Sequence, residues 1–226
     1  MSKRIVIVGG GAAGFFAGIT CAEAAPGTRI TLLEKTAQFL SKVRISGGGR
    51  CNVTHACFEP RELSSHYPRG GEALVGPFQS FQPRDTIDWF ESRGVKLKTE
   101  VDGRIFPASD SSKTIIDCLL KAATAAGIEL AANHAPERAA RREEGGFELG
   151  FADGTTLDCE CLMLATGGCR VPAAGEMVVS LGHTLEPPVP SLFTFHINAP
   201  WLRELAGISV PVVEVSLPVL GRPSCS

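Results

Sequence analysis

Three glycines near the amino terminus have the spacing that could bring a peptide backbone against a phosphate group. Gly9, Gly11 and Gly14 form a Gly-x-Gly-x-x-Gly pattern directly after the apolar, β-branched run 5–8. In such a pattern the first glycine permits a tight turn, the second leaves no Cβ in front of a ligand, and the third lets a helix pack close to a strand. Free N–H groups and the helix dipole would then face the phosphates. The pattern therefore predicts a pyrophosphate-binding turn.

A carboxylate follows at the distance that binding of a nucleoside requires. Glu34 ends a second apolar run about twenty residues after Gly14, which is the spacing found in dinucleotide-binding βαβ units. A carboxylate in this place can accept hydrogen bonds from both hydroxyls of an adenosine ribose, and its charge repels a 2′-phosphate. The alternative is a glycine-rich turn that binds nothing. The coincidence of strand, helix, glycines and acid favours the dinucleotide site.

Two later stretches hold further residues that could contact such a ligand. The stretch 45–52 contains three consecutive glycines and ends in Arg-Cys-Asn, a pattern typical of a shaped loop. The run 162–165 predicts a fully buried strand that leads straight into Thr166-Gly167-Gly168. This second strand-to-glycine junction could approach the same ligand from the carboxyl edge of the sheet.

Arg50 and Cys51 each have a simpler alternative. Arg50 is either a cation near the ligand or a surface arginine in an accidental glycine loop. A thiol at Cys51 would act as a nucleophile or redox partner only with a depressed pKa, and no second cysteine lies at Cys-x-x-Cys spacing. We therefore favour a packed thiol at Cys51. We also interpret His55 and His183 as histidines of a loop and of a helix end rather than as functional groups.

The elements that must position these residues alternate between strands and helices. After the first strand we expect a helix at 12–24, which stops at Pro26-Gly27, and a strand at 29–33. Apolar periodicity and turn signals predict the later elements. These are helices at 85–93 and from a cap at Asp110 or Ser111 to Gly127, strands at 96–99, 104–106 and 128–132, and a hairpin at 147–151 and 155–158. We expect a loop at 39–54 and a mobile or irregular excursion at 59–82, which is rich in proline, glycine and serine.

The composition is that of a globular protein that can bury a core. The chain has 226 residues, of which 44% are hydrophobic. Its formal charge of −2 gives no general attraction to nucleic acid or to an anionic membrane. The apolar run after Lys3 and Arg4 is too short for a signal peptide, and no segment approaches the roughly 18 apolar residues of a membrane span. We therefore expect a cytoplasmic protein with no nucleic-acid or membrane partner.

Eight cysteines occur along the chain without a paired ligand spacing to histidines. In a chain without an export signal we expect reduced thiols, several of them acting as small core residues. Cys159 and Cys161 form the one pair for which we consider a zinc site, but no further ligands are apparent for them. The sequence therefore leads us to expect no metal site.

Three separated motifs together resemble those of the BaiN/RdsA-type (YhiN-like) family of NAD(P)/FAD-dependent oxidoreductases. They are Gly9-x-Gly11-x-x-Gly14 with Glu34, the run Ile-Ser-Gly-Gly-Gly-Arg-Cys-Asn at 45–52, and Leu-Ala-Thr-Gly-Gly at 164–168. The second motif is the most specific of the three. The similarity extends through 103–107 and 181–184 into 188–192, so that it covers most of the chain.

The resemblance implies an α/β fold, with a Rossmann-like FAD-binding domain of glutathione-reductase type and a β-meander. It also implies FAD as the tightly held cofactor and NAD(P)H as co-substrate. The implied cofactor-binding residues are Gly9, Gly11, Ala12, Ala13 and Gly14 at the pyrophosphate, Glu34 at the ribose with Lys35 beside it, Ser46, Arg50, Cys51 and Asn52 near the flavin, and Thr166, Gly167 and Gly168 at the second junction. Arg50 and the amide of Asn52 could there stabilise negative charge on a reduced isoalloxazine ring. The resemblance assigns no catalytic residue.

The chain departs from the family pattern in two places. After Gly168 the family has a longer glycine-rich passage with an acidic residue, whereas only 169–180 precede Leu-Gly-His here. Family members also continue through a substrate domain to a C-terminal segment that returns to the flavin. We therefore expect an FAD/dinucleotide-binding domain at 1–188 and the beginning of a truncated, mostly β substrate domain at 189–226, with strands such as 210–217.

Three functions compete. The first is a flavin-dependent oxidoreductase that reduces an unsaturated or carbonyl small molecule with electrons from NAD(P)H. The second is a catalytically silent FAD- or nucleotide-binding fragment, because a truncated chain would lack one wall of the cofactor site. The third, a flavoprotein that acts on tRNA, is disfavoured by the neutral charge balance and by the lack of a basic stripe interleaved with aromatic residues.

Overall fold

The computed structural model describes residues 3–168, 172–189, 197–205, 208, 215–217 and 222–224. Contacts between Cα atoms divide the chain into two units, Met1–Pro188 and Val189–Ser226. In the second unit a 3-10 helix spans Pro200–Leu205, and strands β11 (Val215–Leu217) and β12 (Arg222–Ser224) pair antiparallel. The strand expected at 210–217 lies partly outside the described residues. The assignment of 189–226 to a substrate domain stays a prediction.

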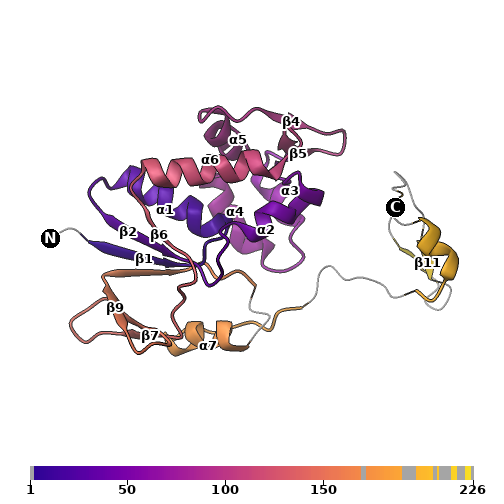
Figure 1. Ribbon diagram of the computed structural model, residues 1–226. Coiled ribbons are helices and arrows are strands. Elements are labelled where there is room, and N and C mark those ends of the chain that lie inside the picture. Colours follow the sequence, from indigo (N-terminus) through magenta and orange to yellow (C-terminus); the bar gives the residue numbers. More distant parts are fainter. Residues whose placement is uncertain are drawn as a thin grey trace. The chain divides into compact units, whose positions relative to one another are not determined.

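A four-stranded parallel sheet forms the centre of the first unit (Figure 1). The strand order is β10-β1-β2-β6, with β1 at Arg4–Val8, β2 at Arg29–Leu33, β6 at Glu129–Ala131 and β10 at Cys161–Leu164. Val8 lies in register with both Leu33 and Leu164. The residues that follow these three therefore meet at the carboxyl edge of the sheet, where doubly wound proteins bind their ligands.

Helices α1 (Ala12–Ala24) and α6 (Ser112–Ala125) cover one face of this sheet (Figure 1). Ile7 of β1 belongs to a buried cluster with Phe15 and Ile19 of α1 and Ile115 and Leu119 of α6. Helices were expected at 12–24 and from Asp110 or Ser111 to Gly127, and both are present.

An antiparallel meander covers the opposite face (Figure 1). Its strands are β7 (Arg138–Arg141), β8 (Phe147–Gly150) and β9 (Thr156–Cys159), and helix α7 (Pro172–Ser180) contacts β7. Val6 and Val8 pack there with Ala139, Leu149 and Cys159, because successive side chains of a strand point to opposite faces. The expected fold class, α/β with a Rossmann-like domain and a β-meander, is confirmed.

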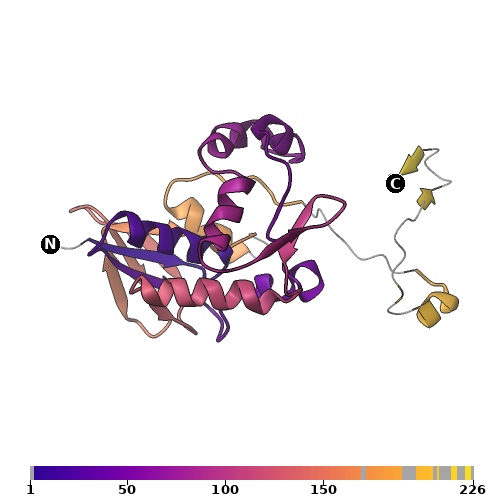
Figure 2. The same cartoon turned by 90° about the horizontal axis from the view of Figure 1, so that it is seen from above.

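The chain between β2 and α6 forms a helical region with a small antiparallel sheet, seen from above in Figure 2. In order, it contains α2 (Ser41–Ile45), a 3-10 turn (Ser46–Gly49), β3 (Thr54–His55), α3 (Pro60–Ser65), α4 (Gly71–Ser80), α5 (Pro83–Glu91), β4 (Leu97–Thr99) and β5 (Arg104–Pro107). The sheet order is β3-β5-β4. The expected pairing of 96–99 with 104–106 is present as β4 and β5.

Two expectations for this region are wrong. The stretch 39–54 is not a loop throughout, because α2 and the 3-10 turn occupy much of it. The stretch 59–82, expected to be irregular, holds α3 and α4. Pro60 is the first residue of α3, a position that favours proline, and the carboxylate of Glu59 accepts the backbone N–H of Glu62 at 2.7 Å as an N-cap. The proline therefore begins a helix where it was interpreted as a sign of irregular chain.

A strand is present where the run 162–165 predicts one, but the prediction that it is fully buried is wrong. Leu162 and Leu164 are only half-buried, and Met163 is 36% exposed. β10 is the edge strand of the described sheet, so that one side of it pairs with no described strand. An apolar run alone does not distinguish such an edge from a central strand.

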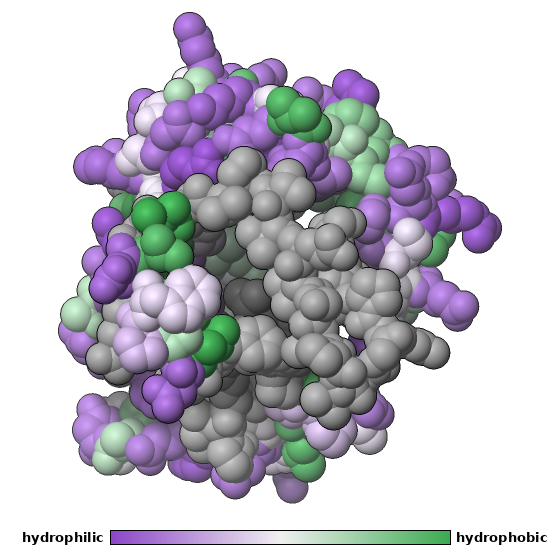
Figure 3. Space-filling view, turned by 90° about the vertical axis from the view of Figure 1, so that its right-hand side faces the viewer, coloured by the Kyte–Doolittle hydropathy of each residue, from purple (hydrophilic) through white to green (hydrophobic). Residues whose placement is uncertain are grey.

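No helix among the described residues has both the length and the apolar character needed to cross a membrane. Figure 3 shows one face of the molecule, on which the coloured surface is largely hydrophilic and apolar residues appear as separate spots. Single apolar residues scattered in this way are ordinary on a protein surface. The coloured part of this face therefore gives no indication of a broad apolar docking surface.

Candidate functional site

Two of the three motif glycines are required by the fold itself. Gly9 has φ +118°, and a Cβ on it would lie 2.3 Å from the carbonyl oxygen of Ala165. A Cβ on Gly14 would lie 2.0 Å from the carbonyl oxygen of Gly9. Both contacts are far shorter than atoms tolerate, so these positions allow the tight turn and the close packing of helix on strand.

Gly11 differs from both. Its φ of −90° and ψ of −172° are extended values that any L-residue adopts. A Cβ on Gly11 would meet no atom within 4 Å. Neither the backbone nor the packing of the described chain therefore calls for glycine here, and the space in front of this position is open.

The amino-terminal end of α1 presents free hydrogen-bond donors to that space. Among the described residues, no partner accepts the backbone N–H groups of Gly11, Ala12, Ala13 or Gly14, and no side chain caps the helix. No acidic residue lies in the first turn. Unpaired N–H groups at a helix N-terminus carry partial positive charge and bind anions. This end of α1 can therefore receive a phosphate or diphosphate.

Glu34 is fixed at the entrance of the same crossover. Its Oε2 accepts the backbone N–H of Gly10 at 2.9 Å, and its Oε1 accepts the N–H and the hydroxyl of Thr36, both at 2.9 Å. A carboxylate oxygen has about two acceptor sites, so that Oε2 keeps one for another donor. A ribose hydroxyl is a donor of the required kind.

Gly10 is a site residue that the sequence pattern treats as variable. A Cβ on it would lie 2.5 Å from Cδ1 of Phe39 and 2.9 Å from Cβ of Glu34. The absence of a side chain thus lets the carboxylate of Glu34 reach the turn. In the sequence, the one sign of this role is that Gly10 lies between Gly9 and Gly11, in a run of three consecutive glycines.

A cavity of about 520 Å³ opens beside the N-terminus of α1, a volume suited to a small organic group. It brings together five residues predicted for the cofactor site. These are Ala12, Ala13, Ser46, Cys51 and Asn52. Apolar side chains from α5 and α6, among them Phe90 and Leu119, form its deeper wall. The cavity could therefore hold a planar ring system next to a bound diphosphate.

Lys42 is a second residue to which the sequence assigned no role. It lies on α2 and lines the cavity. Its Nζ would be 3.1 Å from a Cβ on Gly167, which has φ +78°. The ammonium group of Lys42 thus lies between the cavity and the second strand-to-glycine junction.

The remaining predicted residues lie at the rim or outside the cavity. The backbone at Ala165 and Thr166 abuts Gly9, which brings the two junctions together. Thr166, Gly167 and Gly168 are exposed at that edge, and Lys35 is exposed beyond Glu34. Their part in binding a cofactor stays a prediction.

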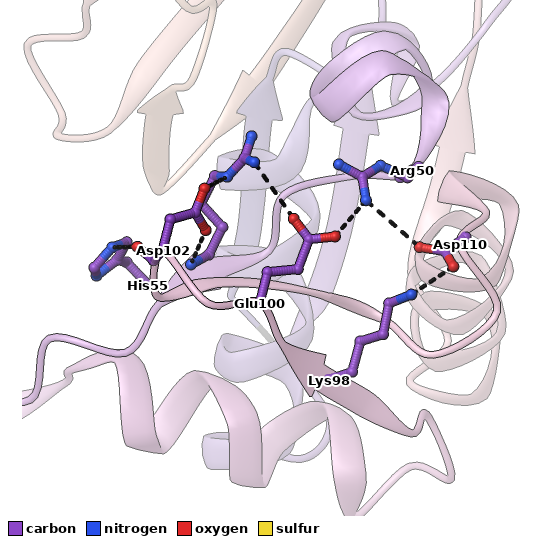
Figure 4. Close-up of polar contacts among 7 residues, drawn as sticks. Arg50, His55, Lys98, Glu100, Asp102 and Asp110 are labelled. Carbon is purple, nitrogen blue, oxygen red and sulfur yellow. Dashed lines mark hydrogen bonds and ion pairs between the residues drawn. The ribbon is translucent and has the colours of Figure 1, made fainter. Parts of the chain in front are cut away.

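Arg50 is engaged in an ionic network rather than in the lining of the cavity (Figure 4). One of its terminal nitrogens lies 2.5 Å from Oε1 of Glu100 and 3.7 Å from Oδ1 of Asp110, and its guanidinium carbon lies 4.0 Å from the ring centre of Phe106. Lys98 binds the other oxygen of Asp110 at 2.5 Å, and this contact is the main reason that the pKa of Asp110 lies below its usual value. Both carboxylates pair with Arg50, and its role as a cation near the cofactor stays a prediction.

Cys51 has the environment of a neutral thiol. It is only 6% exposed, and burial raises its pKa, which disfavours the thiolate needed for nucleophilic chemistry. Its φ of +65° is left-handed, like those of Gly47, Gly48 and Gly49, whereas Arg50 between them has a φ of −89°. The side chain of Asn52 is satisfied when its amide nitrogen donates to the carbonyls of Thr54 and Ile105, at 3.0 and 3.3 Å. The loop is thus a defined turn with a packed thiol.

Comparison with protein families gives one match over most of the chain. The model described as HI0933-like protein Rossmann domain matches residues 3–186. The protein named ribosomal RNA dihydrouridine synthase of Escherichia coli (strain K12) is 30% identical over 217 residues, which are 92% of this chain and 52% of that protein. The protein named 3-dehydro-bile acid delta(4,6)-reductase of Clostridium scindens (strain ATCC 35704 / DSM 5676 / VPI 13733 / 19) is 28% identical over 226 residues, 97% of this chain and 53% of that protein. The chain spans about half the length of these relatives.

Solved structures show the same fold at lower identity. The open conformation of a flavocytochrome c3 fumarate reductase is similar with a TM-score of 0.56 and 22% identity, over 74% of this chain and 34% of that one. The quinol fumarate reductase subunit FrdA of E. coli, with an E245Q mutation, has a TM-score of 0.53 and 17% identity, over 74% of this chain and 33% of that one. These likenesses concern the fold of the first unit.

Proposed function

Because the chain belongs to the HI0933-like Rossmann domain family, we propose that it forms the FAD-binding part of a flavin-dependent oxidoreductase. FAD would supply two-electron oxidation and reduction at its ring system. The protein would supply the position of that ring and the electrostatics around it.

One observation carries the proposal. Gly9 and Gly14 are glycines because neighbouring backbone atoms leave no room for a side chain, whereas Gly11 has ordinary dihedral angles and open space in front of it. A ligand in that space is a physical reason for the missing side chain at Gly11. The unpaired N–H groups around it suit a diphosphate.

The other groups have roles that follow from their places. Glu34 would accept a ribose hydroxyl through the free site on Oε2, and its charge would disfavour a 2′-phosphate. Lys42 would place a positive charge beside the ring system, and the apolar wall with Phe90 and Leu119 would exclude water from one side of it. Cys51 would contribute shape as a neutral thiol.

The proposed substrate is an activated carbon–carbon double bond, with NAD(P)H as electron donor. Two relatives support this class by their names. A delta(4,6)-reductase acts on double bonds of a bile acid, and a dihydrouridine synthase makes a base in which one carbon–carbon double bond of uridine is reduced. We place the reaction on a small molecule in the cytoplasm. The described cysteines are all free thiols, which fits a reducing compartment.

Ribosomal RNA is the second candidate substrate. It is favoured by the relative that is 30% identical over 92% of this chain. The formal charge of −2 speaks against it for the chain as a whole. A third outcome is a protein that binds FAD and catalyses nothing.

A spectroscopic series separates these outcomes. The purified protein is saturated with FAD, and NADH or NADPH is added without oxygen. Bleaching of the flavin absorbance, followed by its return on addition of an unsaturated 3-oxo steroid, supports reduction of a small molecule. Return of the absorbance only with unmodified ribosomal RNA supports the second candidate. Bound FAD that neither nicotinamide reduces contradicts the enzyme assignment, and a protein that binds no FAD contradicts the proposal as a whole.

A further inference from the structure

We propose that Cys57, Glu62 and His66 form a binding site for Zn²⁺ that is separate from the cofactor cavity. One ligand atom from each, the Sγ of Cys57, a carboxylate oxygen of Glu62 and an imidazole nitrogen of His66, lies within 4.8 Å of the other two. None of the three residues lines the cofactor cavity. Their spacing in the sequence, Cys-x4-Glu-x3-His, is not a pattern from which a zinc site is expected.

Two adjoining elements bring these residues together. Cys57 follows β3 and is buried, with 6% of its surface exposed. Glu62 lies on α3, and His66 is the C-cap of the same helix. Residues four positions apart share one face of a helix. The carboxylate and the imidazole therefore both face the thiol from α3.

The side-chain polar atoms of Glu62 and His66 make no hydrogen bond or ion pair in the described part of the chain. The neighbouring carboxylate of Glu59, in contrast, is used as the N-cap of α3. Glu62 and His66 can therefore turn to a cation without breaking an existing contact.

The charges around Cys57 favour a cation. Burial raises the pKa of its thiol, and the nearby carboxylates of Glu62 and Glu59 raise it further. A divalent cation binds the thiolate form of a cysteine, and the thiol proton is released to solvent as the metal binds.

The donor set suits zinc. One sulfur, one nitrogen and one carboxylate oxygen are the ligands that Zn²⁺ accepts, and three protein ligands leave the fourth tetrahedral position to water. Zinc–ligand lengths of about 2.0–2.3 Å imply ligand-to-ligand distances of roughly 3.3–3.6 Å. Rotation of the exposed side chains of Glu62 and His66 can bring the three ligand atoms to these distances.

His55 lies close to His66 but is not one of the three ligands. Its Nε2 lies 2.9 Å from the carbonyl oxygen of Asp102, so that this nitrogen carries the hydrogen and donates. Its ring centre is 6.4 Å from that of His66. We assign it no ligand position, and the bond to Asp102 holds β3, and with it the turn that leads to Cys57.

Cobalt titration of the full chain tests the site. The protein is treated with a chelator, and Co²⁺ is added while difference spectra are recorded against the same sample without metal. We expect one equivalent of Co²⁺ to produce a thiolate-to-cobalt charge-transfer band and the intense visible bands of a tetrahedral site. Addition of Zn²⁺ should remove both sets of bands. A sample that shows no charge-transfer band overturns the proposal, whether or not it binds FAD.

Matched variants identify the ligands. Cys57→Ser should abolish the charge-transfer band. Glu62→Gln and His66→Gln should each weaken Zn²⁺ binding by more than about tenfold, because loss of a group that only supports a metal ligand already weakens binding by about that factor. Cys161→Ser and His183→Gln, which remove an exposed thiol and an exposed imidazole elsewhere, should leave binding unchanged. If Cys57→Ser fails to fold, His66→Gln decides, because its exposed side chain is not needed for packing. Unaltered affinity in His66→Gln, or loss of the band in Cys161→Ser, overturns the assignment.

Discussion

The carboxylate of Glu34 accepts the backbone N–H of Gly10 at 2.9 Å, and this bond joins the end of β2 to the turn that follows β1. The turn and the acid are therefore one unit. A nucleotide that binds across it would meet the N–H groups of α1 and the carboxylate in a fixed relation. This preorganisation favours binding, because these groups lose no further conformational entropy when the ligand binds.

The first prediction concerns Glu34. Glu34→Ala should weaken FAD binding by about ten- to hundredfold, since a hydrogen bond to a charged group contributes about 1.5–3 kcal/mol. The affinity is measured by quenching of flavin fluorescence. Glu129→Ala removes a carboxylate from the adjacent strand β6, away from this turn, and should leave the affinity unchanged. Equal affinity for FAD in the Glu34 variant would remove its proposed contact with the ribose.

The second prediction concerns Gly10. Gly10→Ala should lower the free energy of unfolding by about 1–3 kcal/mol, because the new Cβ would overlap Phe39 and Glu34. Gly76→Ala is the control: Gly76 lies in α4 with no atom within 4 Å of an added Cβ, so this change should be neutral or add up to about 1 kcal/mol. Urea unfolding measures both. Similar stability in the two variants would show that Gly10 does not hold the acid in place.

The third prediction concerns Lys42. Lys42→Met should weaken FAD binding by about two- to fivefold, the effect of losing one partly exposed charge contact, and should reduce the dependence of binding on salt. Arg44→Met removes the same charge from the same helix, but Arg44 does not line the cavity. Equal effects of the two variants would mean that only net charge matters.

The fourth prediction concerns the ionic network. Arg50→Met should lower the melting temperature by more than Arg44→Met does, because two carboxylates and the ring of Phe106 each lose one cationic partner. The pKa of Asp110 is lowered in the folded protein, chiefly by Lys98. The ionised Asp110 therefore stabilises the folded protein at pH values above the usual pKa of an aspartate. This stabilisation is lost as the pH falls through the lowered pKa of Asp110. The difference between the two variants should shrink in acid, and a pH-independent difference would contradict the ionic explanation.

The βαβ unit from Arg4 to Glu34 could be predicted because each step has a local signal. A β-branched run, three spaced glycines and a terminal acid determine strand, turn, helix and strand in order. No such local signal shows whether an apolar strand lies in the centre of a sheet or at its edge. The apolar run of β10 does not reveal that it forms an edge.

Contacts between distant segments also escape the sequence. The partners of Arg50 are Glu100 and Asp110, which lie far along the chain, so the sequence could not show this pairing, and the role of Arg50 near the flavin stays a prediction. The place of Lys42 beside Gly167 depends in the same way on two distant segments meeting. In 59–82 the proline, glycine and serine content and the weak periodicity favour an irregular segment, although Pro60 occupies the first position of α3, where its missing N–H costs nothing.

The fifth prediction tests the central claim, that a diphosphate occupies the open space in front of Gly11. Gly11→Thr keeps a residue suited to the N-cap of α1 and should change the free energy of unfolding by no more than about 0.5 kcal/mol. The new side chain would fill the space in front of the N–H groups. We expect a folded protein that no longer binds FAD in a fluorescence titration, whereas the unaltered chain does. A Gly11→Thr variant that binds FAD as tightly as the unaltered chain would contradict the account.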